Sequence, residues 1–501
     1  MRRSMNTLRR LNTQEWTIRE YVHAVILIFI IGDIVWSLVD QAALTQRAIA
    51  FPFPLEYVEG PNLDRLTRMP DLSGLYPARF DAPPYVATPE PPGFLLAQWP
   101  LAAFNGVSFA IGRAISVLSA VVAALLITLI VRTLSKDWVG AVLAGSALLL
   151  TPHLSQVSLI GGPDTLGFAL SLAGVYAALR VRRPVLAATL AALFFVAAAF
   201  TAPVQVLPAL AAAAAHFAQK RSWRHVAMLL TVFVALCVAV FVFLEAATGG
   251  GFSVNVFSAL GRAFSRDRWL NYVINMVVRS GMLLIMIVLF FFVERLGDGS
   301  SATPVTATYF IAALLNSITS GLSGATLGAV YPLAGAICLA GGVAIAWMSF
   351  NLWLKSLAVI GLLLQINTFI DWTQTIYQPL MGRRFGGARE TAILAQRLRA
   401  QSGPILTDEH LGLQALNGQR PYLYPLEFNQ LHGQGLWSDA QLVDSIRRKE
   451  FALVLWYEPL GSAGGDALIV TRWPESVRNA VYDNYRQSEI FADTIVYVPK
   501  P

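Results

Sequence analysis

The sequence predicts an α-helical membrane protein that crosses the bilayer about eleven times and ends in a small α/β domain. Three observations carry this prediction. Of 501 residues, 55% are hydrophobic and only 13% are charged, against about 25% charged in average soluble proteins. Apolar runs recur along a chain whose mean hydropathy is +0.56. The breaks between these runs alternate in charge. Too few charges remain to cover several water-soluble cores, and the same composition excludes intrinsic disorder.

The apolar runs are the candidate membrane spans. Several are shorter than the ~20 residues that a straight span needs, so we expect them to extend into neighbouring residues. In chain order they are His23–Val39, Phe109–Val131, Val139–Leu150, Thr165–Leu179, Pro184–Phe200, Pro203–Phe217, Val226–Leu244, Val273–Val293, Pro304–Ile318, Leu333–Trp347 and Leu352–Ile370.

The charge of the breaks predicts the orientation. The short breaks near Pro152–Asp164, Thr201–Ala202 and Thr319–Pro332 hold no Lys or Arg. The alternate breaks are basic, as the positive-inside rule requires of cytoplasmic loops. They hold Arg132, Lys136, Arg180, Arg182, Arg183, Lys220, Arg221, Arg224, Arg295 and Lys355. The basic N-terminus is then cytoplasmic, and an odd number of spans places the tail on the outer face. The net charge of +7 follows from this topology and does not indicate nucleic acid.

Three stretches are expected to project outward: loops 41–106 and 246–272, and the tail. We therefore divide the chain into a transmembrane domain, 1–371, and a C-terminal domain, 372–501. The tail alternates helical patterns with short apolar runs, which is typical of a small α/β domain. The helical patterns are Glu390–Ala400 and Asp439–Lys449, and the apolar runs are Pro404–Leu406, Ala452–Leu455 and Thr494–Val498.

Cysteine and histidine suggest neither a disulfide nor a metal site. Cys237 and Cys338 both fall in apolar runs, where a free cysteine packs as a small hydrophobic residue. The six histidines have no paired spacing of the kind that binds zinc. We therefore expect that no cofactor is required, and no divalent metal is indicated.

The first outward loop contains a short helical pattern. Leu63, Leu66 and Met69 recur every three residues within Gly60–Met69, and Glu56 and Glu59 stand in front of them. A carboxylate is favourable at a helix N-terminus, so the simpler interpretation is a capped helix on a solvated loop. The other interpretation is an acidic site.

Several segments together resemble the GT-C glycosyltransferases, the polytopic enzymes that take a sugar from a polyprenyl-phosphate carrier. The resemblance is strongest to the bacterial branch related to protein mannosyltransferases and the aminoarabinose lipid A transferase, and it covers most of the chain. The segments are EYVEGPNLDRLTRM, LYP, a short helical pattern at Gly93–Phe104, FAIGRAISVLSA, GGPDTLG, GGFSVNVFSALGRAFSRDRWLNYV, LTDEHLGLQALNGQRPYLYPLEF and QGLWSDAQLV.

The resemblance implies an acidic catalytic base in the first loop. The family often carries an acidic pair there, and Glu59 matches its second member. The first member falls on Val58, but Glu56 lies three residues before Glu59 and could replace it on a helical turn. Either glutamate is therefore a candidate base. Asp164 matches a second acidic position of the family, although Pro163 replaces the usual neighbouring arginine. The alternative role of Asp164 is to cap the helix that begins at Thr165.

Asp33 and Asp40 lie seven residues apart, on one face of the first span. A carboxylate inside the bilayer is expensive and usually faces a cavity or a partner. We expect Arg113 to pair with Asp33. Because Arg113 also matches an arginine of the family, it is a candidate phosphate ligand as well.

The second outward loop mixes aromatic residues with Arg262, Arg266 and Arg268, and Arg279 follows. This mixture is typical of a helix in the membrane interface. Since arginine binds phosphate oxygens in a two-point fashion, Arg262, Arg266 and Arg279 are candidates to bind the carrier phosphate. His153, near the outer end of the third span, is a further candidate for the cavity wall.

The resemblance implies an inverting glycosyltransferase at the outer face of the bacterial cytoplasmic membrane. Its donor would be a polyprenyl-phosphate sugar held among membrane lipids, and its acceptor a hydroxyl of a glycolipid, polysaccharide or protein. Two other functions stay open. A lipid or solute transporter would use Asp33, but transporters usually have two related halves. A polymerase or ligase of surface polysaccharide has a similar composition.

Overall fold

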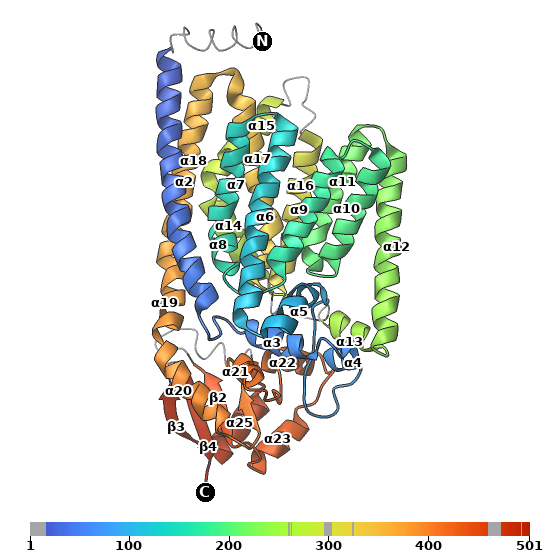
Figure 1. Cartoon of the computed structure of the whole chain (residues 1–501), viewed down its shortest axis with the longest axis vertical. Coiled ribbons are helices and arrows are strands. Elements are labelled where there is room, and N and C mark those ends of the chain that lie inside the picture. The colour runs from blue at the N-terminus through green and yellow to red at the C-terminus, as the bar shows by residue number, and fades with distance from the viewer. Residues whose placement is uncertain are drawn as a thin grey trace.

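The computed structural model describes residues 17–258, 261, 263–294, 303–322, 325–458, 472–491 and 493–501. A bundle of helices forms one end of the molecule, and a small unit with a β-sheet forms the other (Figure 1). The C-terminus lies on this small unit, and the N-terminal end of the first described helix lies at the far end of the bundle. The prediction of a helical bundle with a small C-terminal α/β unit is confirmed.

Every apolar run predicted as a span lies on a helix. The helices are α2 (Ile18–Ala50), α6 (Phe109–Ser135), α7 (Trp138–Leu150), α9 (Asp164–Arg180), α10 (Pro184–Ala199), α11 (Val206–Gln219), α12 (Trp223–Ala247), α14 (Arg266–Arg279) with α15 (Gly281–Glu294), α16 (Thr303–Asn316), α17 (Tyr331–Trp347) and α18 (Leu352–Trp372).

Fewer than the eleven predicted spans are helices long enough to cross a bilayer by themselves. Among the described residues, five are long and apolar enough, or six if α14 and α15 are counted as one span bent by 79°. The others, such as α7 and α10, are shorter apolar helices packed within the bundle. The number of eleven spans therefore stays a prediction, while the multi-pass membrane character is supported.

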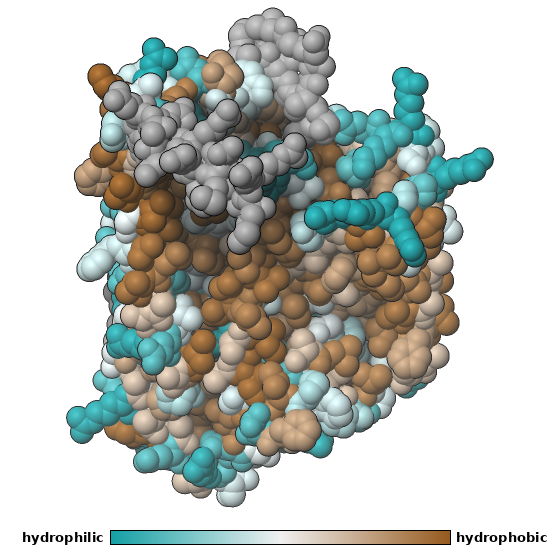
Figure 2. All heavy atoms as spheres, turned by 45° about the horizontal axis from the view of Figure 1, so that its top comes forward, coloured by the Kyte–Doolittle hydropathy of each residue, from teal (hydrophilic) through white to brown (hydrophobic). Residues whose placement is uncertain are grey.

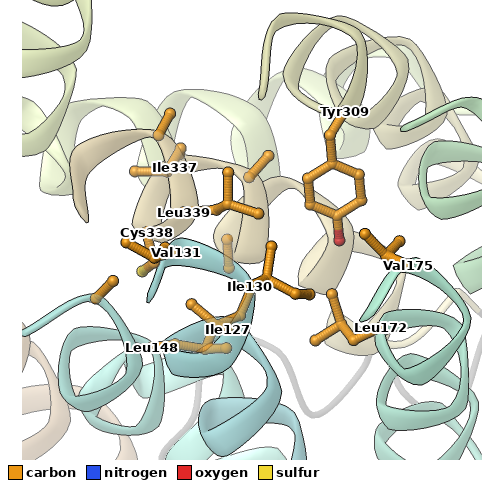
Figure 3. Close-up of a cluster of buried hydrophobic side chains, with 14 of the residues drawn as sticks. Ile127, Ile130, Val131, Leu148, Leu172, Val175, Tyr309, Ile337, Cys338 and Leu339 are labelled. Atoms are coloured by element: carbon orange, nitrogen blue, oxygen red, sulfur yellow. The ribbon is translucent and has the colours of Figure 1, made fainter. Parts of the chain in front are cut away.

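The core of the bundle forms where α6, α7, α9, α16 and α17 meet. Figure 3 shows aliphatic side chains of these helices packed together, among them Ile130 of α6 and Leu172 of α9. Close packing depends on small residues: a Cβ added at Gly140 would lie 2.5 Å from the carbonyl oxygen of Gly342. Small residues let helices approach closely inside membranes.

The bundle surface carries the hydrophobic side chains that a bilayer would cover. Figure 2 shows hydrophobic residues over the middle of the molecule and hydrophilic residues gathered nearer its ends. On α12, Val234, Val238 and Val242 are each more than half exposed. Such an extensive apolar surface is unsuited to water and suited to lipid.

Short helices lie between the bundle and the C-terminal unit. The first outward loop forms α3 (Glu59–Arg68), α4 (Leu72–Leu75) and α5 (Gly93–Asn105), so the helices predicted at Gly60–Met69 and Gly93–Phe104 are confirmed. Two more, α8 (Pro152–Val157) and α13 (Gly251–Ser258), come from the next outward connections. Figure 1 places α3, α4, α5 and α13 at the junction.

The C-terminal unit holds one four-stranded sheet in the order β1-β2-β4-β3. β1 pairs with β2 in parallel, and the other pairs are antiparallel. The strands are β1 (Ile405–Thr407), β2 (Leu453–Tyr457), β3 (Tyr485–Phe491) and β4 (Thr494–Pro499). The described helices are α19 (Gln378–Gly386), α20 (Ala388–Arg399), α21 (Leu411–Leu416), α22 (Pro425–Gly433), α23 (Ala440–Arg447) and α25 (Glu475–Asn484).

The first outward loop docks directly onto this unit. Tyr85 donates its backbone N–H to the carbonyl of Tyr422 at 2.8 Å and accepts from the N–H of Tyr424 at 3.0 Å. The Tyr424 hydroxyl donates to the Asp64 carboxylate of α3. The C-terminal unit and the loop therefore form one continuous wall at this end of the bundle.

Candidate functional site

A cavity of about 380 Å³ opens at the junction between the bundle and the C-terminal unit. The first loop, the start of α9, α14, the segment before α17, and α22 all contribute to it. Its lining residues are Glu56, Tyr57, Val58, Pro89, Glu90, Val157, Ile160, Gly162, Pro163, Asp164, Thr165, Tyr272, Ala325, Thr326, Leu327, Tyr331, Leu426, Glu427 and Gln430. Four of these residues are carboxylates, and none of the described lining residues is Lys, Arg or His. We call this space the polar cavity.

A second cavity of about 580 Å³ shares a wall with the polar cavity. The two have Val58, Pro89, Glu90, Pro163, Asp164, Ala325 and Thr326 in common. Beyond this wall the lining is mostly apolar, and it includes Phe200, Val238, Phe241, Phe252 and Phe257. Because α12 and α13 form part of it, this apolar groove lies beside the exposed face of the bundle.

Among the described residues, Glu56 is the carboxylate of the polar cavity that accepts no hydrogen bond from a side chain. Its side chain is accessible from the cavity, and within the described part of the chain its one hydrogen bond comes from the backbone N–H of Val58 at 3.0 Å. Enclosure by the protein and the nearby Glu409 carboxylate raise the pKa of Glu56, although Arg472 and Arg384 oppose this. A carboxylate with a raised pKa and free oxygen atoms is suited to accept a proton.

Glu59 is the first residue of α3 and is buried, 3% exposed. The Arg113 Nε donates to Oε1 at 2.7 Å and Nη2 donates to Oε2 at 2.7 Å. The backbone N–H groups of Leu55 and Gly161 donate to the same two oxygens at 2.7 and 3.0 Å. Glu59 does not line the polar cavity. This geometry argues against Glu59 as a base and leaves Glu56 as the glutamate of the first loop that faces the cavity.

Arg113 is fully buried, and its remaining N–H groups donate to backbone carbonyls. Nη1 donates to the carbonyls of Ala48 and Phe51 at 2.8 and 2.6 Å, and Nη2 donates to Phe53 at 2.7 Å. No N–H group of this side chain is left to bind a phosphate. The expected pair with Asp33 is wrong, because Arg113 pairs with Glu59 and Asp33 accepts from the Asn367 side-chain amide at 3.3 Å.

Asp164 lines both cavities, at the first turn of α9. Its carboxylate accepts from the Thr326 hydroxyl at 2.6 Å and from the Gln205 amide at 3.5 Å. The helix begins at Asp164 itself, Pro163 is the capping residue, and no side chain caps it. The alternative that Asp164 caps a helix starting at Thr165 is therefore wrong.

The basic candidates of the second loop are dispersed. Arg266 is exposed at the first turn of α14, and Arg262 lies outside the described residues. Arg279 and His153 both pack against the ring of Trp372, with Arg279 over it at 4.4 Å and His153 at 4.8 Å. Neither Arg279 nor His153 lines the two cavities.

The second loop places a different arginine nearer the cavity. Arg268 donates to the Leu322 carbonyl at 3.1 Å, and its charge acts on the phenol of Tyr272, which lines the polar cavity.

The C-terminal unit supplies residues of the cavity wall that the sequence did not single out. Glu427 of α22 accepts from Arg65 at 2.6 Å and from the Tyr57 hydroxyl at 2.7 Å. Arg65 also pairs with Glu90 at 3.0 Å. Glu427 and Glu90 thus share one buried arginine. In the sequence, the one indication of a role for Glu427 is its place in the segment YLYPLEF, on which the family resemblance depends.

A buried ionic cluster lies behind Glu56. Glu409, 1% exposed, pairs with Arg384 of α19 at 2.5 Å and with Arg472 at 2.8 Å. Burial opposes ionisation of Glu409, but the two arginines lower its pKa to about 2. The Arg472 guanidinium lies 5.0 Å from the ring centre of Tyr57, next to Glu56. The cluster therefore joins the end of the last membrane helix to the cavity wall.

Metal-binding geometry is not evident in the part of the chain that the structure describes. Within it, no group of three or more His, Cys, Asp or Glu side chains is arranged to hold an ion.

Comparison with known proteins identifies the fold. No family model and no curated protein sequence matches the chain. Among solved structures, ArnT from Cupriavidus metallidurans in the apo state is similar over 93% of this chain and 97% of its own, with 12% identity and a TM-score of 0.60. ArnT bound to undecaprenyl phosphate gives 11% identity, 93% and 98% coverage, and a TM-score of 0.59.

The Archaeoglobus fulgidus oligosaccharyltransferase tethered to an acceptor peptide gives 12% identity, coverage of 93% of this chain and 74% of its own, and a TM-score of 0.53. The chain thus shares its fold with ArnT and with this oligosaccharyltransferase.

Proposed function

We propose that this protein is a membrane glycosyltransferase that moves one sugar from a polyprenyl-phosphate carrier to an acceptor hydroxyl. The observation that carries the proposal is Glu56, an uncommitted carboxylate in a polar cavity that shares a wall with an apolar groove. A lipid-borne sugar needs both environments side by side, because its chain is apolar and its head is polar. The GT-C fold supports the same function.

The apolar groove is the proposed seat of the carrier chain. Its phenylalanines and valines offer the surface that an isoprenoid prefers to water. The groove lies between α12 and α13, next to lipid-exposed residues, so a carrier could enter from the bilayer. ArnT, which has the same fold, binds undecaprenyl phosphate. The phosphate would lie near the shared wall and the sugar in the polar cavity.

Glu56 is the proposed general base. It accepts the proton of the acceptor hydroxyl as the hydroxyl oxygen forms a bond to the anomeric carbon. The bond from that carbon to the phosphate oxygen breaks, and its electron pair leaves with the polyprenyl phosphate. Attack opposite the phosphate inverts the anomeric centre. Asp164, held by Thr326 and Gln205, is placed to accept a hydrogen bond from a substrate hydroxyl.

The charge of the leaving phosphate needs cations, and we assign these to the second outward loop. The positive charge of Arg268 acts on the phenol of the cavity residue Tyr272. Arg266 is exposed on the same helix. Arg262 belongs to this proposal by sequence alone. Arg113, which the sequence suggested, holds the first loop instead. No resident cofactor is needed in this scheme, so chelators should leave turnover unchanged.

We also propose that the C-terminal unit and both cavities lie outside the cytoplasm. The basic breaks after α6, α9 and α11 lie at the opposite end of these helices from the cavity-lining residues of the first loop and α9. The positive-inside rule assigns such basic loops to the cytoplasm. The acceptor, a glycan, lipid or protein, would then be reached from the outer face of the bacterial cytoplasmic membrane.

Replacing Glu56 tests the proposal. The Glu56→Gln variant and the wild type are reconstituted in lipid nanodiscs with undecaprenyl-phosphate glucose, galactose, mannose or arabinose, and with a membrane lipid extract as acceptor. We expect kcat to fall by about 10²- to 10⁴-fold, the usual contribution of a general base. Glu489→Gln, which changes an exposed glutamate paired with Arg397, is the control. Wild-type turnover by Glu56→Gln, or no transfer from any of the four carriers by the wild type, would contradict the proposal.

A further inference from the structure

Two residues in the wall of the polar cavity carry buried hydroxyls that have no partner among the residues that the structure describes. The Oγ1 atom of Thr165 and the phenolic oxygen of Tyr331 are both enclosed and make no hydrogen bond. Thr165 is 2% exposed and Tyr331 is fully buried. Buried polar atoms are nearly always paired, because an unpaired one loses its hydrogen bonds to water without compensation. We therefore expect each of these hydroxyls to form a hydrogen bond with a ligand that is not part of the chain.

The fold brings these two hydroxyls together from distant parts of the sequence. Thr165 is the second residue of α9 and follows Asp164 directly, while Tyr331 is the first residue of α17. The Tyr331 ring packs against Phe168 of α9 at 5.8 Å. The Asp164 carboxylate is close enough to act on the Tyr331 phenol. The residues Thr165, Tyr331 and Asp164 all line the polar cavity.

The polar groups at this end of the cavity are suited to a ligand rich in hydroxyls. A hydroxyl group can both donate and accept, and Thr165, Tyr331 and Asp164 together offer donors as well as acceptors. None of the described lining residues is a cation. An uncharged sugar ring needs no cation, and it would find partners for its hydroxyls here.

We propose that Thr165 and Tyr331, next to Asp164, form the subsite that binds the hydroxyls of the transferred sugar. This inference rests on the proposed function and deepens it by separating the sugar from the lipid phosphate. The carrier chain occupies the apolar groove, the phosphate lies at the shared wall, and the sugar hydroxyls bind where α9 and α17 begin. Thr165 and Tyr331 are substrate-contacting residues in this scheme, and they take no proton.

The test removes each hydroxyl without changing the shape of its side chain. Tyr331→Phe and Thr165→Val are compared with Tyr309→Phe and Thr306→Val. Tyr309 and Thr306 are also buried and also have unpaired hydroxyls, but they lie on α16 and line neither cavity. Thermal unfolding in nanodiscs is measured with undecaprenyl phosphate alone and with undecaprenyl-phosphate glucose, galactose, mannose and arabinose.

In the wild type we expect at least one of the four sugar-bearing lipids to stabilise more than undecaprenyl phosphate does. Tyr331→Phe and Thr165→Val should lose that additional stabilisation, keep the effect of undecaprenyl phosphate, and lower kcat/KM by about five- to tenfold, as expected for one lost hydrogen bond each. Their stability without ligand should stay at or above that of the wild type, since an unpaired buried hydroxyl is gone. The α16 variants should bind all lipids as the wild type does.

Three results would overturn the inference: no added stabilisation by any of the four sugars, full retention of it in Tyr331→Phe and Thr165→Val, or equal losses in the α16 variants. Failure here is distinguishable from failure of the proposed function. If Glu56→Gln abolishes transfer while Tyr331→Phe and Thr165→Val bind and react normally, only the subsite assignment is wrong.

Discussion

Glu59 and Arg113 form a two-point ion pair in which both side chains are buried, at 2 and 0% side-chain exposure respectively. The pair joins the first turn of α3 to the N-terminal end of α6, and Arg113 also holds three carbonyls of the chain that leads into the loop. Glu56, three residues earlier, faces the cavity, and its carboxylate accepts only the Val58 N–H among the described residues. One glutamate of the first loop therefore holds the wall, and the other is available for chemistry.

Removing either member of the Glu59–Arg113 pair should destabilise the protein. Arg113→Met leaves the Glu59 carboxylate buried without its cation, and Glu59→Gln leaves the guanidinium without its anion. Breaking one side of a buried pair typically costs about 3–5 kcal/mol. Thermal unfolding in nanodiscs measures the loss. Glu56→Gln is the matched control and should unfold like the wild type. Equal stability of Glu59→Gln and the wild type would show that the pair does not hold the loop.

The pH profile of transfer should report the titration of Glu56. Burial and the Glu409 charge raise the pKa of Glu56, and a general base works only when it is deprotonated. Activity should therefore rise with pH, and the midpoint of the acidic limb should lie above the value of an ordinary glutamate, about 4.3. Initial rates at fixed donor concentration, measured at about ten pH values from roughly pH 4 to 8, give this midpoint.

A neighbouring substitution checks the assignment of that limb. Glu409→Gln removes a negative charge close to Glu56 and leaves Arg384 and Arg472 less neutralised, so the acidic limb should shift to lower pH. Glu489→Gln, on the exposed edge strand β3, should leave the profile in place. A shift to higher pH in Glu409→Gln would mean that a group other than Glu56 titrates.

The two cysteines provide a direct probe of the apolar groove. Cys237 lines the groove, whereas Cys338 is fully buried in the bundle core. N-ethylmaleimide should therefore modify one cysteine per chain in the native protein, and Cys237→Ser should abolish the labelling. Undecaprenyl phosphate should slow the reaction because its chain covers Cys237, and phosphatidylglycerol at the same concentration should not. Mass spectrometry follows the modification. Labelling that is unaffected by undecaprenyl phosphate would place the carrier elsewhere.

Gly328 fixes the position of Asp164. A Cβ added at Gly328 would overlap the Asp164 side chain, whereas one added at Gly162, also in the cavity wall, would meet nothing within 4 Å. Gly328→Ala should displace the carboxylate from Thr326 and lower kcat/KM by about tenfold, on the order of one hydrogen bond to a charged group. Gly162→Ala should stay close to the wild type. Steady-state kinetics of both variants test this prediction. Equal rates for Gly328→Ala and the wild type would show that Asp164 does not belong to the site.

Local sequence predicted most of the helices and three of the four strands. Apolar runs and helical spacing are properties of neighbouring residues, so the runs fell on helices and the pattern after Glu59 became α3. β3, Tyr485–Phe491, was missed because it is an exposed edge strand with five consecutive exposed residues. Such a strand buries no face and leaves no alternating apolar pattern. The bend between α14 and α15 likewise falls inside one continuous apolar run.

By itself, the sequence determined the membrane class of the protein, the alternation of its basic loops, its GT-C resemblance and the acidic character of the first outward loop. Each of these depends on composition or on residues close together in the chain. Only the tertiary structure decided that Glu56 faces the cavity while Glu59 pairs with Arg113, that Glu427 of the C-terminal unit completes the wall, and that Thr165 and Tyr331 share one corner. The physical reason is that a carboxylate's role depends on the charges and donors packed around it, and these come from residues up to 370 positions apart in the chain.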